Sequence, residues 1–252
     1  TMGDVARCSV GRATEYHNED LLYKLFGVNA ELLIDHAWGW EPCTMADIKA
    51  YQPSAKSMGA GQVLQEPYTF EKARLIVREM VDLLVLDMVD KGLVADQFVL
   101  TLGYDVENLT DPVRREKYRG PVTVDHYGRA IPKHAHGTAN LGKHTSSTKE
   151  ILAAATELFD RIADMDLLVR RVSMAVNHVI PESALPAERA TEHLDLLTDY
   201  VALERQKALE DGALEREKKR QQAILAITKK YGKNAILRGM NFEEGAMTRE
   251  RN

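Results

Sequence analysis

Cysteine is scarce in this sequence, and no hydrophobic run reaches the length of a membrane span. The two cysteines, Cys8 and Cys43, lie far apart and lack the spacing of metal ligands, so we expect reduced thiols rather than disulfides. Asp82 and Asp87 interrupt the most apolar segment, and the first residues lack the apolar core of a signal peptide. These absences predict a soluble, cytoplasmic chain that has no membrane partner.

The sequence also lacks an overall positive charge. Its 33 Lys and Arg residues against 38 Asp and Glu residues give a net charge of −5, so composition alone does not indicate a polyanionic partner. Residues 113–149 differ, because they hold eight Lys and Arg residues against two Asp and Glu residues, together with His126, His134, His136 and His144. An acidic chain of this kind can still present one basic face.

Catalytic and metal-binding patterns are missing as well. Asp105 and Glu107 lie close together, but such a pair at a strand end is typical of a loop. His134 and His136 share one face of a predicted strand and form only a weak metal candidate. Ser173 has no recognisable base partner. We therefore predict no catalytic residue, no metal site and no cofactor in this chain, and we expect it to be inactive alone.

Hydrophobic periodicity predicts an α+β fold. Apolar residues recur at helical spacing from Ala73 to Met88, whereas Phe98, Leu100 and Leu102 alternate with smaller residues as in a strand. The whole pattern predicts a four-stranded β-α-β-β-α-β sheet with two helices on one face. The expected strands are 56–64, 97–104, 134–142 and 168–179, and the expected helices run from Thr69 to Gly92 and from Ser147 to Ala163.

The chain divides into four predicted parts. Residues 1–42 read as a small helical unit, residues 43–55 as a linker, residues 56–180 as the sheet domain and residues 181–252 as a tail. A basic insertion, 105–132, contains a predicted hairpin that turns near Tyr127 and Gly128. The tail contains a predicted helix over 199–231, which is polar all round at 215–222 and so indicates a solvated helix or one that orders on a partner.

The sheet face away from the helices carries small and polar residues. Small residues allow backbone N–H groups to approach phosphates, and hydroxyl and cationic side chains add donors. Lys56, Ser57, Gly59 and Gly61 fall on the first strand of this face. The alternative is that the glycines mark bulges and the charges are merely solvated. Strand 134–142 lacks the exposed aromatics of an RNA-recognition module, which favours tracking of a backbone.

The order of segments resembles the C-terminal half of a Y-family (DinB/UmuC-like) translesion DNA polymerase. The segment TMGDVA is similar to the end of the thumb helix-hairpin-helix, and LYKLFGVNAELLIDHAWG resembles the segment that closes the thumb. The segments KSMG and RRVSMAVNHV are similar to the first and last strands of the little finger. The tail KKYGKNAILRGMNFEEGAMTRERN resembles that of Gram-positive UmuC-like members.

This resemblance implies a fragment with a thumb end, a little finger and a tail. It further implies a role in DNA repair and SOS mutagenesis, in which the little finger grips primer–template DNA. The paired carboxylates of the palm, and the Mg²⁺ expected for the full-length polymerase, would lie upstream of Thr1. The implied DNA-binding residues are Lys56, Ser57, Gly59, Gly61, Lys133, His136, Thr138, Asn140, Arg170 and Arg171. Arg171 departs from the apolar residue usual in the family.

A second implied site is similar to a sliding-clamp peptide. Its residues are His193, Leu194, Asp195, Leu196 and Leu197, where the family often has Gln-Leu-Asp/Ser-Leu-Phe. His193 and Leu197 depart from that pattern, so we expect weaker clamp binding; alternatively, the leucines only begin the tail helix. Two other functions stay open: a protein-interaction module acting through 193–231, and an independent RNA-binding protein.

Overall fold

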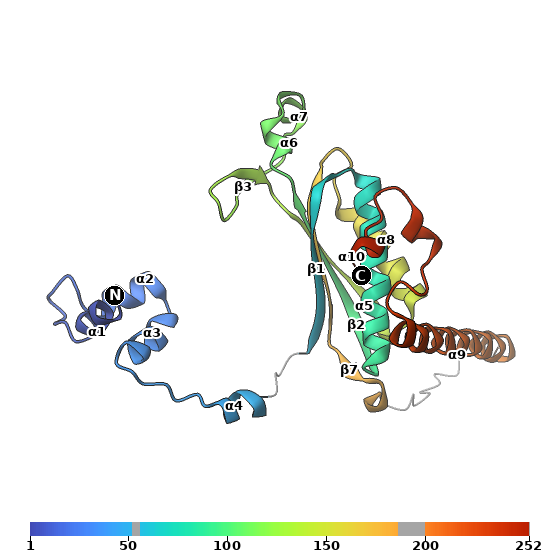
Figure 1. Ribbon diagram of the computed structural model, residues 1–252, viewed down its shortest axis with the longest axis horizontal. Coiled ribbons are helices and arrows are strands. Elements are labelled where there is room, and N and C mark those ends of the chain that lie inside the picture. Colours follow the sequence, from blue (N-terminus) through green and yellow to red (C-terminus); the bar gives the residue numbers. More distant parts are fainter. Residues whose placement is uncertain (52–55, 186–199, 252) are drawn as a thin grey trace. The chain divides into compact units, whose positions relative to one another are not determined.

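The structure, a computed structural model, describes residues 1–51, 56–185 and 200–251, with the backbone alone at 200–204 and 207. Contacts between residues divide the chain into two compact units, Thr1–Ser54 and Ala55–Asn252. Figure 1 shows the elements of both units. Within the described ranges, no helix is both long and apolar enough to cross a membrane.

The first unit consists of short helices around a small core. They are α1 (Met2–Ser9), α2 (Glu19–Phe26), α3 (Asn29–Ala37) and α4 (Met45–Ala50). Thr1 caps α1, because its hydroxyl accepts from the backbone N–H of Asp4. Cys8, Leu22 and Ala30 form the buried cluster. Leu25 and Phe26, which end α2, are 63% and 47% exposed.

The second unit is built on an antiparallel sheet with strand order β1-β6-β2-β5. The α+β class is confirmed. The main elements follow the order β-α-β-β-α-β, and the short strand β7 (Ile180–Pro181) adds a fifth strand to the predicted four. Helices α5 and α8 cover one face of this sheet (Figure 1) and contact each other. In chain order the elements are β1 (Ser57–Tyr68), α5 (Phe70–Asp90), β2 (Leu93–Tyr104), β5 (Ala135–Thr145), α8 (Thr148–Ile162) and β6 (Val169–Asn177).

The core lies between the sheet and these two helices. Phe98, Leu100 and Leu102 of β2 are fully buried, as their alternation predicts. Phe159 of α8 packs against Phe70 of α5, with ring centroids 4.9 Å apart. Such close-packed apolar contacts bury one face of β1, β6, β2 and β5. Among residues 56–185 and 200–251, the opposite face of these strands carries no helix.

β1 and β2 run further than their hydrophobic pattern predicts, whereas β6 is shorter than the expected strand 168–179. β1 extends to Tyr68, past a register shift between Val63 and Tyr68. β2 begins at Leu93, where it pairs with the short strand β7 (Ile180–Pro181). Main-chain pairing therefore lengthens both strands beyond the segments in which apolar residues alternate.

The basic insertion folds onto one end of the sheet. It contains α6 (Glu107–Thr110), α7 (Pro112–Lys117) and the predicted hairpin, whose strands are β3 (Val122–Val124) and β4 (Ala130–Pro132). Gly128 adopts φ 78° in the turn, a conformation that favours glycine. Asn108 is fully buried and donates to the carbonyl oxygens of Asp105 and Leu168, both at 2.9 Å.

The long tail helix α9 (Tyr200–Tyr231) is solvated over part of its polar middle and docked over the rest. Of residues 215–222, five are exposed, whereas Glu217, Lys218 and Gln221 contact the sheet domain. Gln221 is only 3% exposed and donates to the Ser146 carbonyl and the Thr148 hydroxyl. The Glu217 carboxylate accepts from the Ser147 hydroxyl at 2.7 Å and from the Lys149 backbone N–H at 3.1 Å. A carboxylate is favourable there because the first N–H groups of α8 lack partners within the helix.

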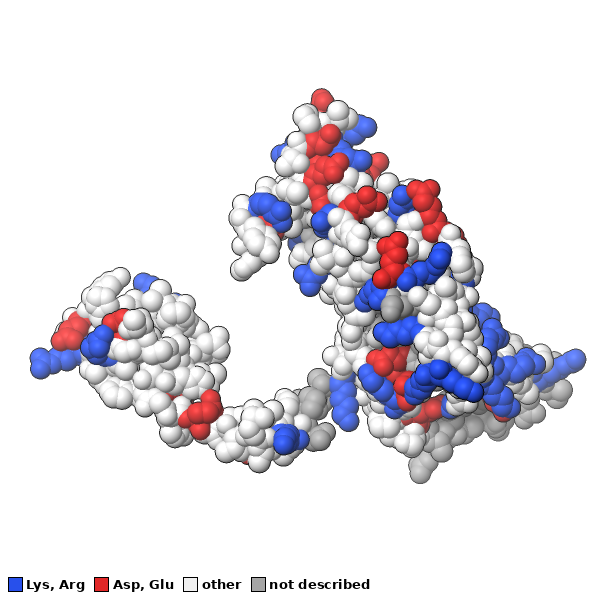
Figure 2. Space-filling model, in the orientation of Figure 1, with Lys and Arg blue, Asp and Glu red and all other residues white. Residues whose placement is uncertain are grey.

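The last residues, 232–251, form a strap along the outer side of α5. They contain a 3-10 turn, η2 (Gly239–Phe242), and α10 (Thr248–Arg251), while another such turn, η1 (Glu182–Ala184), follows β7. Glu79 on α5 is 3% exposed and accepts from Asn241 Nδ2 at 2.7 Å and from the Met247 N–H at 2.8 Å. Figure 2 shows Lys and Arg interspersed with Asp and Glu over this strap and α9. Polar contacts such as those of Glu79 thus hold the strap against α5, although its sequence shows little hydrophobic periodicity.

Candidate nucleic-acid interface

The helix-free face of the sheet, called the open face below, presents short side chains in ordered rows. Each row crosses all four strands in the order β1, β6, β2, β5, because their registers coincide. Side chains at alternate positions share this face, since successive residues of a strand point to opposite sides. The rows are Ser57-Asn177-Gln97-Asn140, Gly59-Ala175-Val99-Thr138 and Gly61-Ser173-Thr101-His136.

Hydrogen bonds between side chains fix the polar groups of two rows. Asn177 Nδ2 donates to Gln97 Oε1 at 2.9 Å, and Gln97 Nε2 donates to Asn140 Oδ1 at 3.2 Å. Two rows away, Thr101 Oγ1 lies 2.9 Å from His136 Nδ1. These contacts hold amide and hydroxyl groups in position while leaving each of them further hydrogen-bonding capacity toward a ligand.

Two glycines, Gly59 and Gly61, leave part of the β1 edge of the open face without side chains. A Cβ atom at Gly59 would lie 3.1 Å from the Met174 carbonyl oxygen, which is a tight contact. At Gly61 the nearest atom, Ser173 Oγ, would be at an ordinary 3.6 Å. Absence of side chains at both positions lets a ligand approach the backbone of β1 closely.

The row beyond Gly61 adds a cation to the open face. Arg171 is exposed and lies opposite Val63 and Gly103, in the row beyond Gly61. None of the residues in these four rows is an aspartate or a glutamate. None is Phe, Tyr or Trp either, so the face offers hydrogen-bond donors and a cation but no stacking platform.

The structure distributes the predicted DNA-binding residues as follows. Ser57, Gly59, Gly61, His136, Thr138, Asn140 and Arg171 lie together on the open face. Lys56 and Lys133 are exposed, directly before β1 and between β4 and β5. Arg170 sits at a register irregularity of β6, and its Nε lies 3.7 Å from Asp105 Oδ2. The predicted clamp peptide, 193–197, lies outside the described residues.

Four further polar residues belong to this face but are not in the predicted set. They are Gln97, Thr101, Ser173 and Asn177. The period of two could have identified these residues, because each lies an even number of positions from another open-face residue of its strand, such as Val99 on β2 or Arg171 on β6. The two strands that carry them are the central strands of the sheet.

Acidic groups near the sheet serve local structure. Asp105 Oδ1 accepts from the Glu107 backbone N–H at 2.8 Å, as is typical of a turn. Across the part of the chain that the structure describes, no three His, Cys, Asp or Glu residues come together to hold a metal ion.

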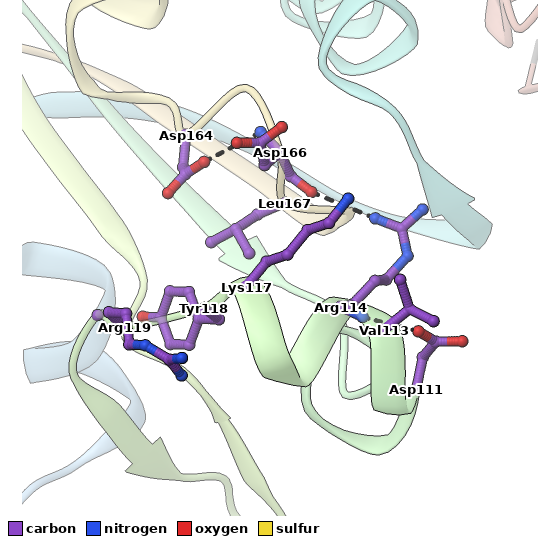
Figure 3. Close-up of a pocket in the computed structure, with 10 residues that line it drawn as sticks. Asp111, Val113, Arg114, Lys117, Tyr118, Arg119, Asp164, Asp166 and Leu167 are labelled. Atoms are coloured by element: carbon purple, nitrogen blue, oxygen red, sulfur yellow. Dashed lines mark hydrogen bonds between the residues drawn. The ribbon is translucent and has the colours of Figure 1, made fainter.

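A cavity of about 620 Å³ lies beside α7, away from the rows of the open face. Figure 3 shows that its polar groups bind one another: Arg114 donates to the Asp166 carbonyl oxygen, and Asp164 accepts from the Asp166 N–H. Asp111 caps α7 by accepting from the Arg114 N–H at 2.8 Å. These contacts indicate a structural role for the cavity lining.

Comparison with known proteins identifies the sheet domain. Residues 55–189 match the family model described as the impB/mucB/samB family C-terminal domain. No curated protein matches the chain. A solved structure titled "Complex of beta-clamp processivity factor and little finger domain of PolIV" aligns over 57% of this chain and 100% of that one, at 12% identity and a TM-score of 0.32, which is too low to support further argument. The chain belongs to the impB/mucB/samB family of Y-family DNA polymerases, and residues 55–189 form the family's C-terminal, little-finger domain.

Proposed function

We propose that the open face binds the phosphate backbone of primer–template DNA during translesion synthesis. The observation that carries this proposal is the set of rows itself: hydroxyl and amide donors, glycines and Arg171, with no carboxylate among them. Contacts of this kind position a duplex without reading its sequence. A polymerase that copies damaged templates needs such a grip, because it cannot depend on the identity of the bases.

The proposed contribution is binding and orientation rather than chemistry. Nucleotidyl transfer would use the Mg²⁺ ions of the full-length polymerase, held by carboxylates outside residues 1–252. Within this chain, Ser173 and Thr138 would donate hydroxyl hydrogen bonds to phosphate oxygens. Lys56, Lys133 and Arg171 would contribute cations, and their binding would release counterions from the DNA.

Fluorescence anisotropy with labelled nucleic acids tests the proposal. The chain should bind primer–template duplex more tightly than single-stranded RNA, and its affinity should fall steeply as salt is raised. Absence of salt-sensitive duplex binding at low ionic strength would contradict the proposal. Preference for single-stranded RNA would instead favour the independent RNA-binding protein.

A second proposed function is attachment to the sliding clamp through His193–Leu197. It rests on the sequence of this peptide and on its place after the last strand of the sheet domain. Leu194, Leu196 and Leu197 would fill an apolar pocket, whereas His193 would lose the hydrogen bonds of the usual glutamine. A pull-down with purified clamp should recover the wild-type chain and lose the Leu196→Ala, Leu197→Ala double variant. Equal recovery of both proteins would exclude this peptide as the clamp contact.

A further inference from the structure

The β3–β4 hairpin is a projecting element of the basic insertion. Figure 1 shows that it extends from one end of the sheet on the side opposite α5 and α8, which is the side of the open face. Within residues 119–133, Arg119, Arg129 and Lys133 outnumber the single acidic residue, Asp125. The hairpin therefore adds positive charge beside rows that contain no aspartate or glutamate.

The tip of this hairpin is held in one conformation by Asp125. Asp125 Oδ1 accepts from the backbone N–H groups of Tyr127 and Arg129, both at 2.9 Å. Its Oδ2 accepts from Arg129 Nε at 2.8 Å. The Asp125 N–H in turn donates to the Arg129 carbonyl oxygen at 2.9 Å. A tip fixed in this way loses little conformational entropy when it meets a partner.

The segment before the hairpin is tied to the sheet through Asn108, and the two ends of the hairpin are tied to each other. Asn108 Oδ1 accepts from the Leu168 N–H at 2.8 Å, in addition to its two donated hydrogen bonds. The Lys133 N–H and the Tyr118 hydroxyl both donate to the Pro121 carbonyl oxygen, each at 2.8 Å. The direction in which the hairpin projects is thus set by hydrogen bonds at its base.

The fixed tip presents an aromatic side chain to solvent. Tyr127 is 79% exposed, and the Arg129 guanidinium carbon lies 5.2 Å from the centre of its ring. Val124, on the neighbouring strand, is 69% exposed. An exposed ring with a cation beside it suits the minor groove of DNA, which admits single side chains but not a helix.

We propose that the β3–β4 hairpin is a second DNA contact, which reaches over a duplex lying on the open face and places Tyr127 in its minor groove. This inference rests on the proposed function. Arg119 and Lys133 would meet the phosphates that border the groove, while Asp125 holds the shape of the tip. A duplex would then be held from two sides, by the open face and by the hairpin.

Substitution of Tyr127 tests this inference against a matched control. Tyr231 on α9 is 67% exposed and has a lysine, Lys230, 5.1 Å from its ring centre, but it belongs to the tail. Tyr127→Ala should weaken duplex binding about tenfold, whereas Tyr231→Ala should bind as the wild type does. Both variants should keep the wild-type melting temperature, because both rings are exposed.

A photo-crosslinking residue at position 127 gives an independent readout. With a benzophenone-bearing amino acid there, light should join the chain to primer–template DNA, and the same residue at position 231 should not. Wild-type affinity of Tyr127→Ala together with no crosslink to DNA would overturn the hairpin contact while leaving the open face intact. Crosslinking only to protein would also overturn it. If the wild type binds no duplex, the proposed function itself fails.

Discussion

Asn177 on β6 donates from Nδ2 to Gln97 Oε1 on β2 at 2.9 Å. Gln97 Nε2 in turn donates to Asn140 Oδ1 on β5, so that hydrogen bonds between amide side chains link three adjacent strands. These groups lie on the surface, where water could satisfy each of them separately. Their mutual hydrogen bonds instead fix which atoms face outward, and that arrangement prepares the face for a ligand with regularly spaced acceptors.

Replacing Gln97 by leucine should uncouple this amide ladder. We expect Gln97→Leu to weaken duplex binding several-fold, whereas its free energy of unfolding should change by only about 1 kcal/mol, since each lost hydrogen bond is partly replaced by water. Anisotropy and urea denaturation measure the two effects. Gln206→Leu removes an exposed glutamine that bonds within α9 and should leave binding unchanged. Equal loss of affinity in both variants would contradict the role of the ladder.

Arg171 should account for about one phosphate contact. Arg171→Ala should reduce the slope of log affinity against log salt by about 1. Titrations of duplex DNA at several salt concentrations give this slope directly. Lys149→Ala removes an exposed cation from α8, on the covered side of the sheet, and should keep the wild-type slope. An unchanged slope for Arg171→Ala would show that this guanidinium does not meet the DNA.

Glu79 should stabilise the docked strap. Glu79→Ala removes the acceptor for Asn241 Nδ2 and for the backbone N–H groups of Met247 and Thr248. Leaving such buried donors without partners should cost about 1–3 kcal/mol in free energy of unfolding. Chemical denaturation measures this loss, with Glu71→Ala on the exposed start of α5 as the control. A Glu79→Ala variant as stable as that control would mean that the strap contributes little.

Asp82 should make stability depend on pH. Burial raises the pKa of its carboxyl above the ordinary value, although the Arg238 guanidinium opposes the shift. The folded protein therefore binds this proton more tightly than the unfolded chain does. Relative to the charged carboxyl, the protonated one stabilises the fold at pH values below the ordinary aspartate pKa of about 3.9. This stabilisation is lost as pH rises from that value through the raised pKa, so the free energy of unfolding falls over this range.

Comparison with Asp82→Asn isolates this contribution. The free energy of unfolding of the wild type minus that of Asp82→Asn should fall through the same pH window and then level off. Urea denaturation at closely spaced pH values measures this difference. A difference that grows as pH rises would mean that Arg238 outweighs burial and holds the pKa below its ordinary value.

Local periodicity predicted the core side of the sheet well. The alternation of Phe98, Leu100 and Leu102 identified both faces of β2, because one buried face imposes a period of two. On β6 the alternation of the two faces is interrupted near Arg170 and Arg171. The register irregularity there carries Arg170 to an ion pair with Asp105 and leaves Arg171 on the open face. A bulge of one residue exchanges the two faces, and its position depends on pairing with other strands.

The docked tail could not be predicted from local pattern. Its contacts join residues far apart in sequence, such as Arg238 with Asp82 and Glu217 with the start of α8. The two buried carboxylates of α5, Glu79 and Asp82, interrupt its apolar residues, and this interruption is the sequence signal of a polar partner. Buried acidic groups require such partners, but the sequence alone does not indicate which segment provides them.

Inserting one carboxylate into the open face is the most direct test of DNA binding there. Ser173 lies on central strand β6, and Ser173→Asp would place a negative charge among the proposed phosphate contacts. Ala153→Asp adds the same charge to an exposed position of α8 on the covered side. By anisotropy at low salt, Ser173→Asp should lose primer–template affinity by about tenfold or more, while Ala153→Asp stays near the wild type. Equal affinities for the two variants would contradict the assignment of DNA binding to the open face.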